Sequence, residues 1–426
     1  MVIIKNFAQL ATSPLRRDAL QIIEVGLHAI DTEKVIKTTV KFHKNKFLAI
    51  KDTWLDLDKY RRIYFVGIGK AAFAAAKALE TTLGNRITDG LVLDIQGGRL
   101  KKIKSLVGTH PDPTEANVSA TREIISLLRS ASEEDLVIAV ISGGGSSLLC
   151  SPYQISCQEK ASVVDAMMDS GATIEEINTV RKHLSEIKGG NFAKIAYPAT
   201  VVSLIFSDVP GNDVSMVASG PTVLDPTTIT DASKIMAKYD VLKKCKLPHC
   251  DLMETPKNPM YFQLVTNIIV ADERLAIDAM RVEAVKLEYK VEVFSYQIEG
   301  RAEEVAKKLV LNTKPKTALL AAGETTVEVK GGGRGGRNQH LVLSALNHLR
   351  EDQVIVSVNS DGIDHSSFAG AIGDEHTLAN AKKKKLASKK FLDNCDSFHF
   401  FQKVGDGIET GALSSNISDF MLALSK

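Results

Sequence analysis

The chain has 426 residues, of which 44% are hydrophobic and 24% charged, a composition typical of a globular protein with room for two or three domains. Its 53 basic and 51 acidic residues give a formal charge of +2, so no overall field favours nucleic acid or an anionic membrane, and we expect neither as a partner. The N-terminus has no targeting pattern, and the longest apolar run, 136–141, is far too short to cross a bilayer. Five cysteines without a CxxC pair favour reduced thiols and a cytoplasmic location.

Apolar residues at helical spacing predict an amphipathic helix within residues 14–42. A strand over 62–66 then leads through a tight glycine turn into an alanine-rich helix ending near Leu83. Gly67, Gly69 and Ala72 match the G-x-G-x-x-A pattern of dinucleotide-binding folds, and Asp94 ends the next strand, 91–93. An NAD(P)-dependent oxidoreductase of a small hydroxy acid is therefore one hypothesis. Lys70, inside the turn, can instead reach a bound phosphate or carboxylate.

The apolar run 136–141 indicates a central parallel strand, and a serine-flanked glycine turn follows it. Open α/β sheets bind their ligands where such strands end, so this turn is a candidate ligand site formed by Ser142, Gly143, Gly144, Gly145 and Ser146. A helix over 174–184 adds Arg181. A strand over 200–206 ends just before Asp208, which is placed to hold magnesium.

Three prolines interrupt the pattern within 243–259, which predicts a domain boundary and hence domains 1–250 and 251–426. Beyond this break we expect strands at 267–270, 291–294 and 318–321, and helices at 272–289 and 302–311. The second domain is therefore also of the α/β class.

The stretch Gly331–Gln339 contains five glycines between an expected strand, 325–330, and a helix reaching Leu349. Converging amides and a helix start favour a phosphate, and Arg334 and Arg337 add positive charge. It is not a Walker A loop, because arginine replaces the lysine and Asn338 the hydroxyl. A turn with solvated arginines is the alternative interpretation. The candidate binding residues here are Glu324, Gly333, Gly335, Gly336, Arg337 and Asn338.

Two aspartates, Asp361 and Asp364, follow a strand predicted over 353–358. They can share a hard cation or divide the roles of base and metal ligand. A last glycine turn, 405–411, precedes an expected C-terminal helix. Anion-binding loops, cations and acids together favour phosphoryl transfer with magnesium, while a binding protein without chemistry is a further alternative.

Several longer motifs resemble the glycerate 2-kinases of the MOFRL type, and the resemblance runs from about Gly67 to the C-terminus; the motifs are Ser142–Leu149, Ile177–Ser185, Lys188–Gly190, Ser207–Val209, Ala218–Thr222, Gly323–Thr326 and Gly331–Gln339. The resemblance implies phosphorylation of D-glycerate at its 2-hydroxyl by ATP and Mg²⁺. It also implies an N-terminal Rossmann-like doubly wound sheet, a smaller C-terminal α/β (MOFRL) domain and an active site in the cleft between them.

The resemblance also implies catalytic residues by position. The lysine of the family's G-x-G-K-A turn falls on Lys70, the arginine of G-G-R-N-Q on Arg337 and the leading acid of D-G-x-D on Asp361. We expect Lys70 and Arg337 to neutralise charge on the phosphoryl group and on the glycerate carboxylate. Asp361 is either a magnesium ligand or the base, and Asp208 and Asp364 are further metal candidates. The sequence leaves a homodimer open.

Overall fold

The computed structural model describes residues 2–426, which divide into two compact units. The middle unit is Val35–Val270, and the terminal unit combines the residues up to Lys34 with Ala271–Lys426. This division differs from the one expected from the sequence. The chain returns to the terminal unit after 270 rather than after 250, and the first helices belong with the C-terminal part.

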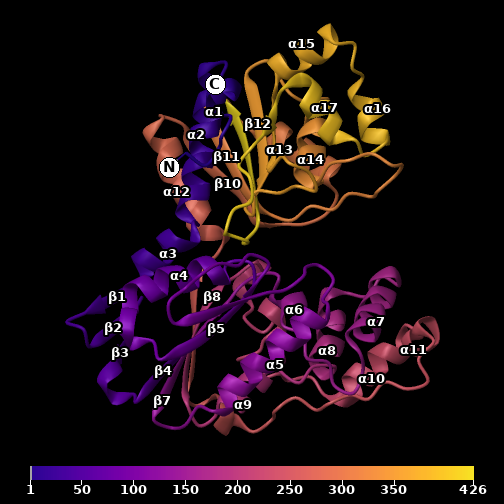
Figure 1. The fold of residues 1–426 in the computed structure, drawn as a ribbon. Coiled ribbons are helices and arrows are strands. Elements are labelled where there is room, and N and C mark those ends of the chain that lie inside the picture. The colour runs from indigo at the N-terminus through magenta and orange to yellow at the C-terminus, as the bar shows by residue number, and fades with distance from the viewer. Residues whose placement is uncertain (1) are drawn as a thin grey trace. The chain divides into compact units, whose positions relative to one another are not determined.

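The elements of the middle unit are β1 (Val40–His43), β2 (Phe47–Ile50), β3 (Thr53–Asp56), β4 (Arg62–Ile68), α4 (Ala72–Leu83), β5 (Asp89–Asp94), β6 (Ile103–Val107), α5 (Glu115–Arg129), β7 (Asp135–Ile141), α6 (Gly145–Leu148), α7 (Cys157–Asp169), α8 (Ile174–His183), α9 (Asn191–Ala196), β8 (Thr200–Phe206), α10 (Ile229–Lys238), α11 (Val241–Cys245) and β9 (Val265–Ala271). Its main sheet has the order β6-β5-β4-β7-β8-β9 (Figure 1). The pairs from β6 to β8 are all parallel.

This order is that of a Rossmann-like doubly wound sheet, so the predicted fold of the first domain is confirmed. Every residue of β7 is buried, as a central parallel strand requires, and the core on one face of the sheet is shared with α5 and α9. The chain order reverses between β4 and β7. Ligands of such sheets bind beside the carboxyl ends of the strands at this switch point.

The elements of the terminal unit are α1 (Phe7–Leu10), α2 (Pro14–Ala29), α3 (Thr32–Thr39, which continues into the middle unit), α12 (Glu273–Lys286), β10 (Lys290–Ile298), α13 (Ala302–Asn312), β11 (Thr317–Gly323), α14 (Arg337–Ala345), β12 (Gln353–Asn359), β13 (Gly370–Asp374), α15 (Glu375–Lys383), α16 (Ser388–Asp393), α17 (Ser397–Val404), β14 (Gly407–Ile408) and β15 (Asp419–Ser425). Its sheet has the order β10-β11-β15-β12-β13-β14. β15 runs antiparallel to both of its neighbours, β11 and β12.

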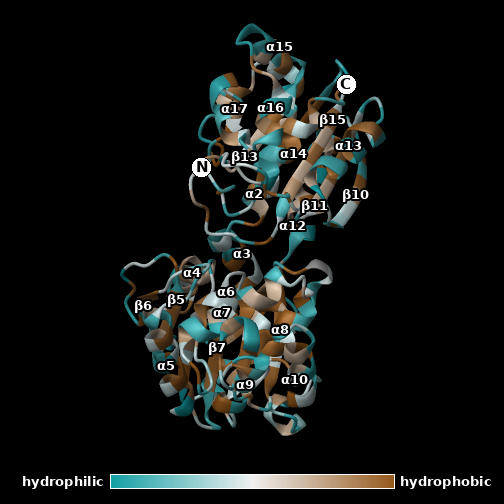
Figure 2. Ribbon diagram, turned by 90° about the vertical axis from the view of Figure 1, so that its right-hand side faces the viewer, coloured by the Kyte–Doolittle hydropathy of each residue, from teal (hydrophilic) through white to brown (hydrophobic). Residues whose placement is uncertain are grey.

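Helices cover both faces of this second sheet, with α2 and α12 on one side and α13 and α14 on the other (Figure 1). The N-terminal helix belongs here because it packs closely on α12: a Cβ at Gly26 would lie only 2.6 Å from Cγ of Met280. The fully buried Arg16 also pairs with Asp406 near the far end of the sequence. Figure 2 shows the lysine-bearing α15 mostly hydrophilic and β15 mostly hydrophobic. No helix within residues 2–426 is long and apolar enough to cross a membrane.

Two sequence predictions of secondary structure are wrong. Residues 325–330 form no strand; Thr326 makes a single bridge to Arg301, and Val329 is 78% exposed. The expected C-terminal helix is the strand β15, whose seven residues are all buried. A short apolar run reads alike in a buried helix and a buried strand, and here the open position between β11 and β12 decides for the strand.

Candidate functional site

The loops after β4 and β7 interlock at the switch point of the middle sheet. The Lys70 amide donates to the Gly143 carbonyl at 3.0 Å, and the Ala71 amide donates to Oγ of Ser142 at 3.1 Å. Gly69 has φ +110°, and a Cβ there would lie 2.2 Å from Oγ of Ser142, so only glycine fits. The structure thus brings together two loops that the sequence predicts as separate sites.

Four successive amides at the start of α4, from Lys70 to Phe73, are bonded within the protein. Besides the Lys70 and Ala71 amides, that of Phe73 donates to the Asp94 carboxylate at 2.9 Å. Burial raises the pKa of Asp94, while its bonds from the Phe73 and Gln96 amides lower it. In a dinucleotide-binding fold these amides face the pyrophosphate. Gly67 likewise has a packing role, because a Cβ there would lie 2.9 Å from Cγ2 of Val92.

The second loop keeps two amides that can bind an anion. In the described part of the chain, the amides of Gly143 and Gly144 have no hydrogen-bond partner. The Lys70 side chain and the His110 ring flank Gly144, whose hypothetical Cβ would lie 3.1 Å from Cγ of Lys70 and 3.3 Å from Cδ2 of His110. Successive free amides beside a cation form an anion-binding nest. The sequence analysis missed His110, which lies in an irregular loop and shows no pattern.

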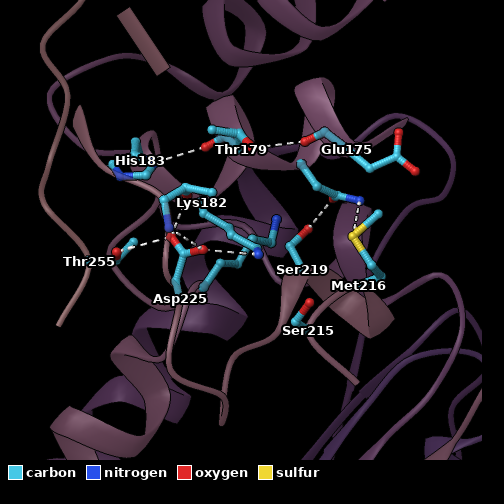
Figure 3. Close-up of polar contacts among 12 residues, drawn as sticks. Glu175, Thr179, Lys182, His183, Ser215, Met216, Ser219, Asp225 and Thr255 are labelled. Carbon is cyan, nitrogen blue, oxygen red and sulfur yellow. Dashed lines mark hydrogen bonds and ion pairs between the residues drawn. The ribbon is translucent and has the colours of Figure 1, made fainter. Parts of the chain in front are cut away.

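Polar side chains extend this loop toward α8. Oγ of Ser146 lies 3.2 Å from Oγ of Ser219, which donates to Oδ1 of Asn178 at 2.9 Å. Figure 3 shows Ser219 and Met216 beside α8. Ser219 and its neighbour Ala218 both have positive φ, 61° and 51°, a strained conformation that tight packing must hold in place. Gly145 lies in the same contact, because a Cβ there would approach the Ala218 Cβ to 2.7 Å.

The cationic residues of α8 have different environments. Lys182 is buried and pairs with Asp225 at 3.2 Å, and Asp225 also accepts a bond from Thr255 (Figure 3). His183 is buried as well. Both therefore have structural roles. Arg181 is only partly buried and lines a cavity with Ser146, so it is the member of this cluster that a ligand can reach.

In the terminal unit, Arg337 lies between two carboxylates. Its Nε and Nη2 donate to Asp419, the latter at 3.2 Å, and its Nη1 lies 2.8 Å from Oε2 of Glu324. The Asp419 side chain is fully buried, whereas that of Glu324 is 52% exposed. Asp419 therefore holds the guanidinium in place on its buried side, and Glu324 pairs with it on the side nearer to solvent.

Asp419 is a functional candidate that the sequence analysis missed. It begins β15, where it pairs in register with Gly323 at the end of β11 and with Asn359 at the end of β12. The pKa of Asp419 is raised to about 7. Burial is the main cause, the positive charge of Arg337 opposes it, and the negative charges of Glu324 and Asp364 raise the pKa further. A polar residue opening an otherwise apolar segment, 419–424, was its only sequence signal.

The structure gives Asp364 a role other than the expected metal ligand. Its buried carboxylate accepts hydrogen bonds from the amides of Asn338 (3.2 Å) and Gln339 (2.9 Å) and from both of their side chains. Burial raises the pKa of Asp364, and these bonds lower it. The carboxylate thus takes the place at the start of α14 where the sequence predicts a phosphate. Gly336 is required because a Cβ there would lie 2.1 Å from Oδ1 of Asp364.

The side chain of Asn338 likewise has its hydrogen-bond partners inside the protein, although the sequence predicts that it binds the nucleotide. Its side chain is 1% exposed. Its Oδ1 accepts from Ser357, and its Nδ2 donates to Asp364. The residue therefore ties α14 to β12.

The first part of the glycine-rich loop 331–336 is bonded to the segment Asn394–Asp396, whereas the amides of Gly335, Gly336 and Arg337 have no hydrogen-bond partner among the described residues. The amides of Gly332, Gly333 and Arg334 donate to Asn394 Oδ1, the Asn394 carbonyl and Asp396 Oδ1 at 3.3, 3.0 and 3.0 Å. Arg334 also stacks on the ring of Phe398 at 4.7 Å. The glycines, Gly333 and Gly335 included, allow two stretches of backbone to approach closely, and the phosphate site predicted for this loop stays a prediction.

The remaining acids stand at strand ends. Asp361 follows β12, where its Oδ1 accepts from the Ile363 amide at 2.9 Å and its carbonyl from the Leu413 amide at 2.7 Å. Asp208 follows β8 in the middle unit. Both are partly exposed. Within residues 2–426, no three His, Cys, Asp or Glu side chains form a ready metal cage.

Two family models match successive parts of the chain. Residues 18–251 match a domain of unknown function, DUF4147, and residues 317–419 match the MOFRL family. The chain is 33% identical to the D-glycerate 2-kinase of Thermotoga maritima, with 96% of this chain and 98% of that protein covered. It is also 35% identical to a putative hydroxypyruvate reductase of Agrobacterium vitis, with 85% and 87% covered.

A solved structure supports the same relationship. The crystal structure of the glycerate kinase from Thermotoga maritima superposes on this chain with a TM-score of 0.83 at 31% identity. It covers 96% of this chain and 99% of its own. The likeness therefore extends over both units.

Proposed function

We propose that this chain, which belongs to the family of MOFRL-type glycerate 2-kinases, transfers the terminal phosphoryl group of ATP to the 2-hydroxyl of D-glycerate. The products are ADP and 2-phosphoglycerate. The observation that carries the proposal is the pair of unbonded amides, Gly143 and Gly144, beside Lys70 at the switch point of the middle sheet.

Phosphoryl transfer depends mainly on positioning and on compensating negative charge. The amides of Gly143 and Gly144 are held in place by the interlocked loop, so they bind phosphate oxygens without rearrangement. Lys70 contributes a compact positive charge at the same place. We assign these groups to the transferring phosphoryl group, and Ser142 to holding the loop through its bond from the Ala71 amide.

Arg337 binds a substrate anion by exchanging one of its two carboxylate partners for that anion. The buried Asp419 stays bonded, because moving it would leave an unpaired charge inside the protein. Glu324 is exposed and is the carboxylate that a substrate anion displaces. Arg337 then meets the substrate in an orientation that Asp419 has already fixed.

Magnesium fits the acids that remain. Mg²⁺ usually keeps several waters and takes only one or two carboxylates, which agrees with the lack of a three-ligand cage within residues 2–426. Asp361 in the terminal unit or Asp208 in the middle unit would be a protein ligand of the ion, and Asp361 is alternatively the base that orients the hydroxyl. When bound with ATP, the ion neutralises charge on the phosphates.

The expected cleft between domains and the expected homodimer stay predictions. The five free cysteines support the expected cytoplasmic location.

A product assay tests the proposal. The purified full chain is incubated with D-glycerate, ATP and Mg²⁺, and ADP and the phosphoglycerate isomer are identified by ³¹P NMR. We expect ADP in equal amount to 2-phosphoglycerate, and none without glycerate. ADP release that ignores glycerate, or phosphate on the 3-hydroxyl, would contradict the proposal.

An oxidoreductase is the second candidate, because relatives named putative hydroxypyruvate reductase match the chain. The geometry favours it less. The amides of Lys70, Ala71 and Phe73, which would bind the pyrophosphate, already have partners within the protein. The carboxylate of Asp94 accepts the hydrogen bond from the Phe73 amide. We expect no oxidation of NADH or NADPH with hydroxypyruvate, measured at 340 nm.

A further inference from the structure

A cavity of about 300 Å³ lies in the middle unit beside the loop after β7. Its wall includes Pro111, Ser146, Ser147, Lys160, Val164 and Arg181. Ser146 and Ser147 belong to α6, which directly follows the Gly143–Gly144 turn. Pro111 in turn follows His110, which flanks Gly144.

One buried lysine, Lys160, lines this cavity, and a second, Lys188, contacts the lining residue Ser146. Lys160 is 4% exposed, and Lys188 is fully buried. Lys188 donates to the Ser146 carbonyl, and Nζ of Lys160 lies 3.8 Å from Sγ of Cys150. Burial lowers the pKa of Lys188 well below its usual value, and the neighbouring Lys160 and Arg181 lower it further.

The wall of the cavity carries two cations, Lys160 and Arg181, and two acids, Asp112 and Asp165. In the described part of the chain, neither Lys160 nor Lys188 bonds to a carboxylate. Asp165 acts on Arg181, whose pKa burial lowers and Asp165 raises. Lys188 avoids the cost of burying a charge through its lowered pKa, whereas Lys160 lines the cavity without a bonded carboxylate and can donate to the anionic group of a ligand.

We infer that this cavity binds the carboxylate of the acceptor acid, with Lys160 and Arg181 as binding residues and Lys188 positioning Ser146 through its carbonyl. The inference rests on the proposed function and names the acid's place within it. Small size favours a three-carbon acid over a nucleotide, since 300 Å³ is at the lower end for ligand sites. The apolar side chains of Ala161 and Val164 complete the wall for its carbon chain.

Direct binding to the full chain tests this inference without requiring turnover. Calorimetry without nucleotide compares D-glycerate, uncharged glycerol, inorganic phosphate and, separately, ATP with Mg²⁺. The variants are Lys160→Met and Arg181→Gln, and the controls are the exposed Lys194→Met and Arg122→Gln. Each loss of a charge-assisted hydrogen bond should weaken D-glycerate binding by about 10- to 100-fold. Glycerol should not bind, and ATP affinity should change by less than about twofold.

The inference would be overturned if both variants bound D-glycerate as tightly as the wild type. It would also be overturned if the variants lost affinity only for ATP or only for inorganic phosphate. Thermal melts check folding, and should Lys160→Met fail to fold, Arg181→Gln at its partly exposed position decides. A wild type that binds glycerate, loses it in the variants, yet forms no 2-phosphoglycerate would support the site and refute the proposed function. A wild type that phosphorylates glycerate with unchanged KM in both variants would refute the site alone.

Discussion

Two glycine-rich loops in this chain have similar sequences but use their backbone amides differently. In the loop after β7, the amides of Gly143 and Gly144 have no partner in the described residues and lie beside Lys70. In the loop 331–336, three successive amides are bonded to Asn394 and Asp396. Both loops precede a helix.

The difference shows what a run of glycines reports. It indicates that something approaches the backbone closely, but the approaching group can be a ligand or another part of the chain. In the loop 331–336 it is the segment between α16 and α17, and at the start of α14 it is the Asp364 carboxylate. The amides of Gly332, Gly333 and Arg334 are therefore not available to an anion, whereas those of Gly335, Gly336 and Arg337 have no partner in the described residues, as at Gly143 and Gly144.

The largest expected effect is a loss of kcat on removing Lys70, the cation beside the loop after β7. Lys70→Met should lower kcat by about 10²- to 10³-fold, the usual loss for one charge-stabilising group, without lowering Tm. The matched variant is Arg334→Met, which removes a cation stacked on Phe398 and should leave kcat unchanged. A coupled ADP assay measures both. Equal losses of kcat in the two variants would mean that both loops bind phosphate.

Asp364→Asn tests whether this acid caps a helix or binds magnesium. Asparagine has one acceptor oxygen and turns a donor toward the amides of α14, so we expect a loss of about 2–4 kcal/mol in unfolding free energy by urea denaturation. The Mg²⁺ concentration for half-maximal activity should stay the same. Asp361→Asn is the comparison, and it should raise that concentration. A raised requirement in Asp364→Asn at normal stability would restore the metal role.

A pair of glycine substitutions separates the two loops by stability and activity. Gly335→Ala would place its Cβ 2.1 Å from Oγ of Ser397 at φ +140°, so it should destabilise the fold by about 2–3 kcal/mol and leave KM for ATP unchanged. Gly144→Ala meets only side chains, 3.1 Å from Lys70 at φ +78°. It should cost about 1–2 kcal/mol and raise KM for ATP. The reverse pattern of KM changes would contradict the assignment.

The smallest expected effect concerns pH. Because the pKa of Asp419 is raised to about 7, the folded protein takes up this proton as pH falls through 7, and Arg337 loses an ionised partner. Activity should therefore fall on the acid side of pH 7, by up to about tenfold. The unfolded chain takes up the same proton only near pH 4, so this residue's contribution to stability decreases as pH rises from 4 to 7. Asp419→Asn should remove both trends; an unchanged activity limb near pH 7 would assign it to another group.

Much of the fold could be predicted from the sequence. The strands at 62–68 and 135–141 are parallel strands that are buried except at Arg62, and after their first, charged residue they appear in the sequence as apolar runs. The turns at Gly69 and Gly144 need positive φ, which glycine residues reveal. The boundary after residue 250 was less accurate, because the proline-rich segment leads back to β9 at the edge of the same sheet.

The candidate site was predicted in parts. Lys70 and the turn 142–146 were each identified, yet that the two loops interlock depends on β4 and β7 being neighbours. Asp419, His110 and Lys160 were missed, since each acquires its role from residues distant in sequence. Asp364 and Asn338 were assigned to ligands because their partners on other elements were unknown.

The sequence by itself therefore determined the elements, the turns and the kinds of chemical group that this protein carries. The tertiary structure alone decided which amides and charges are already satisfied inside the protein and which remain for a ligand. The physical reason is range: helices, strands and turns depend on residues a few positions apart, whereas the loop amide of Ala71 has its hydrogen-bond partner 71 positions away.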